Sequence, residues 1–126
     1  MNKISIREHY PYTREHAPSS TLNASAKDLS VWMVYFLNSL QGSSRAAYQN
    51  MITPSFSPYP YIGLGFQLYD VHSKKAIGHY GGDKGFRSFL MMIPEQNIGI
   101  VLLANCDYNE DFRQEIVYEI ASLIIR

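Results

Sequence analysis

The stretch that decides the fold is residues 78–105, GHYGGDKGFRSFLMMIPEQNIGIVLLAN. It contains two apolar runs, 86–93 and 98–104, which are separated by the four residues Pro-Glu-Gln-Asn at 94–97. Apolar runs of this length joined by a four-residue polar connection are typical of a β-hairpin. The run Gly-Gly-Asp-Lys-Gly at 81–85 is rich in turn-forming residues and predicts a loop before the hairpin.

Two more strands are predicted upstream of this loop. Residues 76–80 predict one strand, entered through a turn at 72–75. From Tyr61 onwards the apolar residues recur at every second position, as in a strand that is buried on one face. The alternating residues are Ile62, Leu64, Phe66 and Leu68. The glycines between them, Gly63 and Gly65, would let another backbone or side chain approach closely.

Helical periodicity is found on the N-terminal side of these strands. Ser25 and Asp28 have the spacing of a capping box, which marks the start of a helix. Over residues 26–40 the apolar positions recur every three or four residues, which predicts an amphipathic helix. These positions are Leu29, Trp32, Met33, Phe36, Leu37 and Leu40. A second, shorter helix is predicted at 44–51, before a proline-rich linker.

A closing helix is predicted from about Asp111. Its apolar stripe consists of Phe112, Ile116, Ile120 and Leu123 or Ile124. The predicted fold class is therefore α+β: an antiparallel sheet of about four strands, flanked by an N-terminal and a C-terminal helix. Residues 1–24 have no helical or strand periodicity and predict an irregular arm, so the α+β segment is expected at 25–126.

Composition excludes several classes of partner. The chain has 126 residues, the size of one domain, and eleven basic residues balance eleven acidic ones. A net charge of zero gives no reason to expect nucleic acid or an anionic membrane as partner. The single cysteine, Cys106, excludes an intrachain disulfide. No apolar run has the length of a bilayer span, and the four histidines have no metal-ligand spacing.

The stretch 78–105 resembles the last motif region of the serine β-lactamase, penicillin-binding protein (DD-peptidase) and esterase family. In that family a basic residue, a small residue and glycine lie on an edge strand, as Lys-Thr-Gly or His-x-Gly. The motif is followed by Gly-Phe, Pro-Glu, Gly-Ile-Val and Leu-Ala-Asn, all of which are present here. Residues 19–33 resemble the family's preceding helix entry, and YIGLGF at 61–66 resembles its Tyr-Gly-Leu-Gly-aromatic strand. The three matches cover about residues 18–125 and imply a partial β-lactamase/transpeptidase-like fold.

The resemblance implies roles for four consecutive residues. His79 takes the place of the basic residue, which holds a substrate carboxylate or shapes the proton network. Gly81 takes the place of the motif glycine, and Gly82 follows where the strand supplies a backbone N–H to the oxyanion hole. Tyr80 stands where the family has Thr, Ser or Gly, so its ring would fill the cleft or offer a hydroxyl to the substrate. We therefore expect His79 and Gly82 to be catalytic, and Tyr80 and Gly81 to bind substrate. The resemblance implies no metal and no cofactor.

The family's other two motifs are not found at the expected places. No serine of the chain has a lysine three residues later, so the Ser-x-x-Lys nucleophile motif is absent from these 126 residues. Tyr48-Gln49-Asn50 has the letters of the Tyr-x-Asn motif, but it follows the helix at 26–40, whereas the family's motif precedes that region. The chain is therefore expected to be a C-terminal segment of a serine hydrolase that is inactive alone.

Several alternatives stay open at this stage. The chain is either a segment of an enzyme or a non-catalytic binding module derived from the same fold, in which His79 would be an ordinary strand residue. Its expected partner is the missing N-terminal half, or a second copy that pairs with an open sheet edge such as 98–104. The parent enzyme would act on an acyl substrate or a peptidoglycan-like ligand. The N-terminus contains no signal-like stretch, which predicts the cytoplasm if Met1 is the natural start, and the cell envelope or periplasm for a longer parent.

Overall fold

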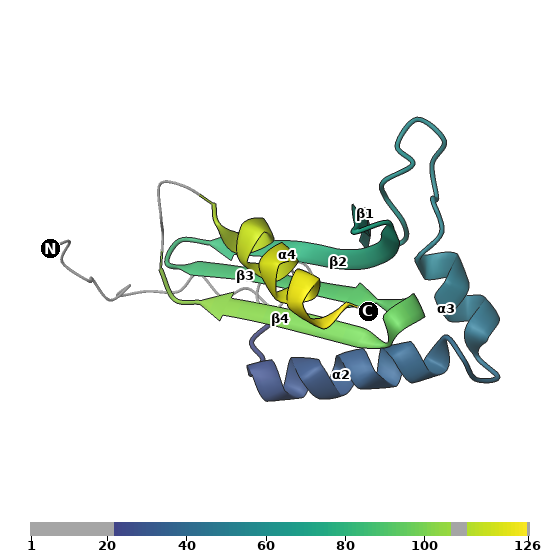
Figure 1. Ribbon diagram of the computed structural model, residues 1–126, viewed down its shortest axis with the longest axis horizontal. Coiled ribbons are helices and arrows are strands. Elements are labelled where there is room, and N and C mark those ends of the chain that lie inside the picture. The colour runs from purple at the N-terminus through teal and green to yellow at the C-terminus, as the bar shows by residue number, and fades with distance from the viewer. Residues whose placement is uncertain (1–21, 107–110, 126) are drawn as a thin grey trace, which may run out of the picture.

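The computed structural model describes residues 22–106 and 111–125, which form a four-stranded antiparallel sheet with helices before and after it (Figure 1). The strands lie in sequence order, and each one pairs with its neighbour in the chain. They are β1 (Gln67–Val71), β2 (Lys74–Asp83), β3 (Phe86–Ile93) and β4 (Ile98–Ala104). The helices are α2 (Ala26–Ser39), α3 (Arg45–Met51), the 3-10 turn η2 (Pro94–Gln96) and α4 (Arg113–Ile124). The predicted α+β class is confirmed.

The sheet is covered on both faces, and a separate apolar core lies on each. Alternate residues of β3 point to opposite faces, so Met91 packs with α4 while Met92 packs with α2. On the α4 face, Val117 and Ala121 of the helix are fully buried against the strands. The core on the α2 face contains Met33, Phe36, Leu37, Leu40, Phe66, Ile77 and Met92. The sheet is therefore the middle layer of three.

The start of α2 is as predicted. Ser25 is the N-cap residue, and its Oγ accepts a hydrogen bond from the backbone N–H of Asp28 at 3.1 Å. The Ser25 hydroxyl also donates to Asp28 Oδ2 at 2.7 Å. An N-cap serine satisfies one of the free N–H groups at a helix start and stabilises a helix by about 1 kcal/mol.

The hairpin predicted at 86–104 is confirmed. β3 and β4 have the predicted bounds, with Ile93 opposite Ile98. The connection forms one 3-10 turn and ends at Asn97, which has a left-handed conformation with φ 54°. Asparagine tolerates this conformation better than most residues, which explains why the chain can reverse here without a glycine.

The loop predicted at 81–85 is largely wrong. β2 continues through Gly81 and Gly82 to Asp83, and the reversal is confined to Lys84 and Gly85. Gly85 has φ 81°, the conformation that such a tight turn requires. Glycine was read as loop-forming, but pairing with β3 holds the first two glycines in the strand. The turn at 72–75 is likewise shorter than predicted, because β2 already begins at Lys74.

The strand predicted from Tyr61 is also wrong over its first six residues, since β1 begins only at Gln67. The segment before it is an irregular loop that runs along the end of α3. The Leu64 N–H donates to the carbonyl oxygen of Met51 at 2.8 Å, and a Cβ on Gly63 would lie 2.3 Å from that oxygen. Another backbone therefore approaches Gly63 closely, as expected, and this backbone belongs to the end of α3 rather than to a strand.

The buried face of α4 differs from the predicted stripe. The residues in contact with the sheet are Arg113, Val117 and Ala121, whereas the predicted stripe is exposed. Its members are Phe112, Ile116, Ile120, Leu123 and Ile124, with exposed fractions from 38% to 84%. The helical periodicity was predicted correctly. However, two stripes of residues, offset by one position, have the same periodicity, and the stripe with the smaller side chains lies against the sheet.

The predicted arm at 1–24 lies outside the described residues up to residue 21. Among the helices that the structure describes, none has the length and apolar character needed to cross a bilayer.

Candidate functional site

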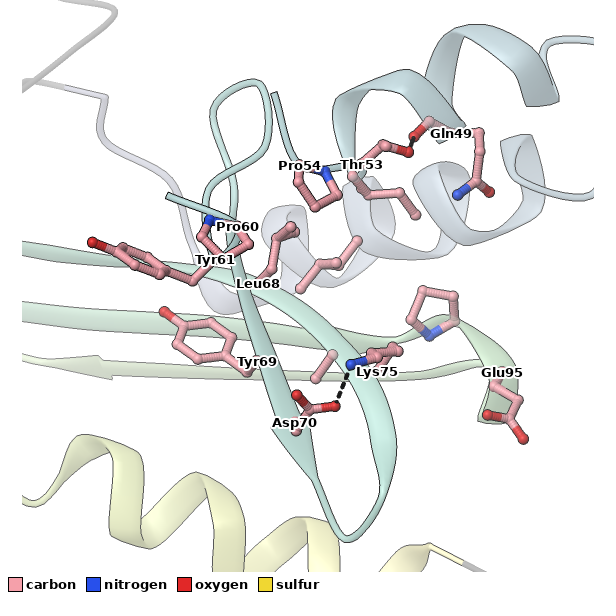
Figure 2. Close-up of a pocket in the computed structure, with 14 residues that line it drawn as sticks. Gln49, Thr53, Pro54, Pro60, Tyr61, Leu68, Tyr69, Asp70, Lys75 and Glu95 are labelled. Carbon is pink, nitrogen blue, oxygen red and sulfur yellow. Dashed lines mark hydrogen bonds and ion pairs between the residues drawn. The ribbon is translucent and has the colours of Figure 1, made fainter. Parts of the chain in front are cut away.

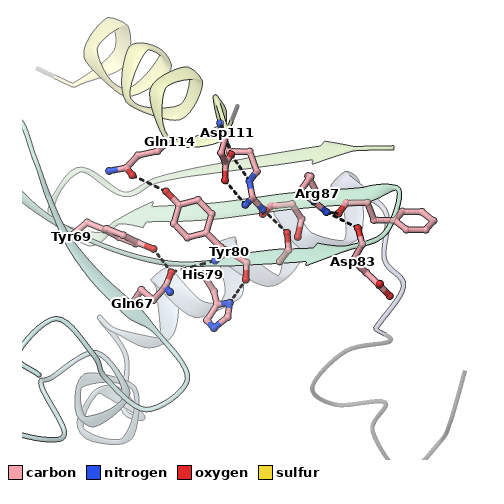
Figure 3. Close-up of polar contacts among 12 residues, drawn as sticks. Gln67, Tyr69, His79, Tyr80, Asp83, Arg87, Asp111 and Gln114 are labelled. Carbon is pink, nitrogen blue, oxygen red and sulfur yellow. Dashed lines mark hydrogen bonds and ion pairs between the residues drawn. The ribbon is translucent and has the colours of Figure 1, made fainter. Parts of the chain in front are cut away.

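His79 and Tyr80 project from opposite faces of β2, as neighbouring strand residues must. His79 is exposed, and its Nδ1 contacts the backbone oxygen of Tyr80 (Figure 3). Tyr80 points to the α4 face, where it packs in the partly buried layer around the core. The two side chains therefore do not share one cleft, although they were expected to act on the same substrate.

The Tyr80 ring is held by contacts with residues of β1, β3 and α4. It stacks on Phe89 of β3, with ring centroids 4.2 Å apart and an angle of 3° between the planes. The ring of Tyr69 meets the Tyr80 ring edge-on, and the Tyr80 hydroxyl donates to Oε1 of Gln114 in α4 at 2.9 Å. Burial, followed by the nearby Tyr118 and Asp111, raises the pKa of Tyr80. These contacts account for the tyrosine as an anchor between the strand and α4.

Gly81 and Gly82 lie on the part of β2 that pairs with β3 but not with β1. The pairing of β1 with β2 ends at Gln67 opposite Gly78, so among the described residues no strand pairs with that side of β2 from His79 onwards. The Tyr80 N–H points to this side, because it donates to the side-chain oxygen of Gln67 at 3.4 Å. Since backbone direction alternates along a strand, the N–H of Gly82 points to the same open side.

Gly81 lies close to a side chain of the neighbouring strand. A Cβ there would lie 2.2 Å from the hydroxyl oxygen of Ser88, which is the paired residue on β3. At position 82, by contrast, the closest atom to an added Cβ is the flexible end of Arg87 at 3.6 Å. Gly82 is exposed, so its backbone is accessible to a ligand.

Behind this strand lies a buried arginine that the sequence analysis did not single out. Arg113, in the first turn of α4, is 8% exposed. Its Nη1 donates to the backbone oxygens of Gly81 at 2.5 Å and of Ser88 at 2.7 Å. Its Nε and Nη2 donate to the two carboxylate oxygens of Asp111, at 2.8 and 2.6 Å. The hydrogen bond from Arg113 is the main reason why the pKa of Asp111 is lowered to about 2.

Only one sequence signal could have found this group. An arginine at the start of a helix is unfavourable for the helix dipole, so a second role there is worth seeking. The sequence analysis instead singled out the neighbouring apolar stripe of the same helix. The structure brings together Arg113, Tyr80 and Gly81, whereas His79 lies on the other face.

A cavity of about 660 Å³ lies near the other end of β2 (Figure 2). Its walls come from α3, the proline-rich loop, β1 and the start of β2. They include Thr53, Pro54, Pro60, Tyr61, Leu68 and Lys75, and the ion pair of Lys75 with Asp70 at 2.7 Å is part of the lining. None of residues 79–82 lines the cavity, so it is separate from the motif.

Other residues considered at the sequence level have ordinary structural surroundings. Tyr48, which has the letters of the Tyr-x-Asn motif, packs edge-on against Phe36 with ring centroids 5.0 Å apart. Within the part of the chain that the structure describes, no three His, Cys, Asp or Glu side chains are grouped so as to hold a metal ion.

The sequence of the chain identifies the class of protein to which it belongs. The sequence model of the Beta-lactamase family matches residues 4–123, so the chain belongs to this family. The resemblance to serine β-lactamases and penicillin-binding proteins is thereby confirmed.

A curated relative shows how much of a longer protein the chain matches. The chain is 28% identical over 113 residues to Protein flp of Staphylococcus aureus (strain MW2). The match covers 86% of this chain but only 22% of that protein, so the chain spans about a fifth of the relative's length. No solved structure is significantly similar to the chain.

Proposed function

We propose that the chain provides one wall of the active site of a β-lactamase-related serine hydrolase, which hydrolyses an amide or ester through an acyl-serine. In this proposal the Gly82 N–H is a donor to the oxyanion and His79 is the basic residue of the motif. Tyr80 and Gly81 bind substrate through the backbone along which the acyl group lies. The observation that supports it best is the open side of β2 beyond Gly78, towards which the Gly82 N–H points.

The physical reason is that an oxyanion needs donors that are already in place before the charge develops. A strand without a neighbour offers N–H groups in fixed directions, and two glycines leave room for an acyl group beside them. His79 adds an exposed ring on the adjacent position of the same strand.

The nucleophile must come from residues outside these 126, because the sequence contains no Ser-x-x-Lys. The purified chain is therefore expected to hydrolyse neither nitrocefin nor p-nitrophenyl acetate, and to take no label from a fluorophosphonate or a fluorescent penicillin. A labelled serine would contradict the proposal, and its position would identify the nucleophile.

A direct test of the wall itself is a nuclear magnetic resonance titration of the ¹⁵N-labelled chain with a phosphonate monoester, which mimics a tetrahedral oxyanion. We expect the amide signals of residues 79–83 to shift, and Gly82→Pro to abolish the effect because proline has no N–H. Gly82→Ala is the matched control, since it keeps the N–H and its Cβ would meet no atom closer than 3.6 Å. Shifts located elsewhere, or unchanged in Gly82→Pro, would contradict the proposal.

A non-catalytic binding module is the second candidate, and Tyr80 favours it, because its ring is packed between β3 and α4 where the family has Thr, Ser or Gly. The two candidates differ when the chain is mixed with a separately produced N-terminal half that carries the nucleophile. An enzyme segment restores hydrolysis in the mixture, whereas a binding module gives the phosphonate shifts and no hydrolysis.

We further propose that β4 pairs with a missing N-terminal half or with a second copy of the chain. β4 is the last strand in the sheet order, so among the described strands none covers its outer side. An unpaired strand edge carries free N–H and C=O groups that can pair with another chain.

A further inference from the structure

The peptide between Gly81 and Gly82 is contacted by a charged group at its carbonyl end. This peptide consists of the Gly81 C=O and the Gly82 N–H, which point in opposite directions across a planar unit. Arg113 Nη1 donates to the Gly81 oxygen at 2.5 Å (Figure 3). Whatever fixes this oxygen therefore also fixes the direction of the N–H on the other side.

Such a constraint is needed at this position. Glycine adopts a wider range of backbone angles than any other residue, and two glycines follow each other here. On the N–H side β2 has no neighbouring strand from His79 onwards among the described residues. In the part of the chain that the structure describes, β3 alone pairs with this half of β2, which therefore has less support than the half before it.

Arg113 is suited to hold the peptide because its own position is determined. Two nitrogens of the guanidinium are bonded to both carboxylate oxygens of Asp111, which leaves Nη1 directed at the strand. The guanidinium carbon lies 4.8 Å from the centre of the Tyr80 ring, a cation–π contact. The rigid fork of arginine can make all these contacts together, whereas the single ammonium of lysine cannot.

The charge also affects the strength of the N–H as a donor. A hydrogen bond from a charged group to a carbonyl oxygen polarises the peptide, and hydrogen bonds in a chain strengthen one another. The Gly82 N–H thus becomes a better donor to an anion on the open side. Ser88, whose oxygen shares Nη1 at 2.7 Å, keeps the guanidinium centred between the paired strands.

We infer that Arg113 is a positioning residue that locks and polarises the Gly81–Gly82 peptide, so that the Gly82 N–H is held towards the open side of β2 as an anion donor. The inference rests on the proposed function for the use of this N–H. The lock itself can be measured without any turnover.

The test compares the wild-type chain with Arg113→Met and Arg113→Lys, and with Arg45→Met as the control on α3. The carbonyl ¹³C of Gly81 and the amide ¹⁵N of Gly82 report directly on the hydrogen bond at the Gly81 oxygen. We expect both signals to move in Arg113→Met, to move less in Arg113→Lys, and to stay unchanged in Arg45→Met. The dissociation constant of the phosphonate monoester is expected to rise roughly tenfold in Arg113→Met, in line with the loss of a charge-assisted bond.

A purely structural role would give a different pattern. If the signals of Met91 and Met92, near the end of β3, move as much as those of the Gly81–Gly82 peptide, Arg113 only stabilises the sheet and the inference is wrong. Unchanged Gly81 and Gly82 signals in a folded Arg113→Met chain would also overturn it. Should Arg113→Met not fold, Asp111→Asn keeps the arginine but removes the charge that orients it, and the same two signals are read.

The outcome can be separated from that of the proposed function. If the phosphonate does not bind the wild-type chain, the proposed use of the Gly82 N–H fails. The Gly81 and Gly82 signals of the variants still decide whether Arg113 holds the peptide.

Discussion

The glycines of β2 look alike in sequence but have different surroundings. A Cβ on Gly78 would lie 2.1 Å from the backbone oxygen of Leu90 on the paired strand, and the two strands cannot separate locally without losing their pairing. At Gly82 the nearest atom is 3.6 Å away and belongs to a flexible arginine. A glycine imposed by packing can thus be distinguished from one that leaves space for a ligand.

Gly78→Ala is therefore expected to lower the free energy of unfolding by roughly 2–3 kcal/mol, the range for overpacking a core. Gly82→Ala is the matched control and is expected to change it by less than about 0.5 kcal/mol, as for an exposed position. Urea denaturation measures both. Equal losses would show that the two sites are packed alike, contrary to this description.

The ion pair of Asp111 predicts a dependence of stability on pH. The pKa of Asp111 is lowered from 3.8 to about 2, chiefly by the hydrogen bond from Arg113. A lowered pKa means that the ionised form stabilises the folded chain above pH 3.8, and that this contribution is lost as the pH falls through about 2. Wild type should therefore be more stable than Asp111→Asn at neutral pH, and the difference should shrink between about pH 4 and 2. Urea midpoints across this range check it, and a difference that does not change with pH would contradict it.

At the scale of the elements, α4 shows where periodicity is ambiguous. Its sequence offers two stripes one residue apart, one of large apolar residues and one that contains Arg113, Val117 and Ala121. The smaller residues Val117 and Ala121 lie against the sheet, and Arg113 donates a hydrogen bond to the backbone oxygen of Gly81. Hydrophobicity alone favours burial of the stripe of large apolar residues, since it takes no account of the hydrogen bonds that Arg113 donates to backbone carbonyl groups.

Val117→Ala is expected to destabilise the chain by about 2 kcal/mol, because it leaves a cavity at a fully buried position. Ile116→Ala removes more carbon atoms, but its side chain is 43% exposed, so we expect a change of less than about 0.5 kcal/mol. Thermal or urea unfolding of the two variants decides between the faces. A larger loss in Ile116→Ala would restore the stripe predicted from sequence.

The strands differ in how well the sequence predicts them. β3 and β4 were predicted at their observed bounds, because each consists mainly of apolar residues and the turn between them has its own signal. β2 was predicted too short, since glycine weakens a local strand signal while pairing with β3 stabilises the strand from outside. The alternation before Gln67 suggested a strand, but a hydrogen bond from the Leu64 N–H to the Met51 oxygen at the end of α3 holds that segment in a loop.

The same distinction applies to the candidate site. His79 and Gly82 were chosen from the family motif, and both lie on the part of β2 that does not pair with β1, while their roles stay predictions. The contact of Arg113 with Gly81 joins residues 32 positions apart. No local pattern encodes a contact of this kind, because it depends on how the last helix lies on the sheet.

At the scale of the whole molecule, two exposed apolar surfaces are candidates for the self-association proposed above. One is the outer strand β4, where Leu103 is 42% exposed. The other is the exposed stripe of α4, represented by Ile116. Pairing of β4 forms backbone hydrogen bonds as well as apolar contacts, which favours the strand.

Leu103→Lys is therefore expected to abolish any concentration-dependent increase in mass, because a lysine on an edge strand opposes pairing. Ile116→Lys is the control and is expected to associate like the wild type. Light scattering after gel filtration at several concentrations measures the mass. If only Ile116→Lys is monomeric, α4 rather than β4 forms the contact, and a wild-type chain that stays monomeric at high concentration contradicts the association itself.

The sheet order described above also has a consequence for kinetics. Each strand pairs with the next one along the chain, through two connections of two residues and one of four, so the loops that must close are short. Short loops lose little entropy on closure, and sheets made from local contacts form rapidly. The meander can thus take shape soon after these residues leave the ribosome, before any distant segment has been recruited. A strand that pairs with this sheet later then binds to a surface that is already rigid. Only the added strand loses conformational entropy when it binds.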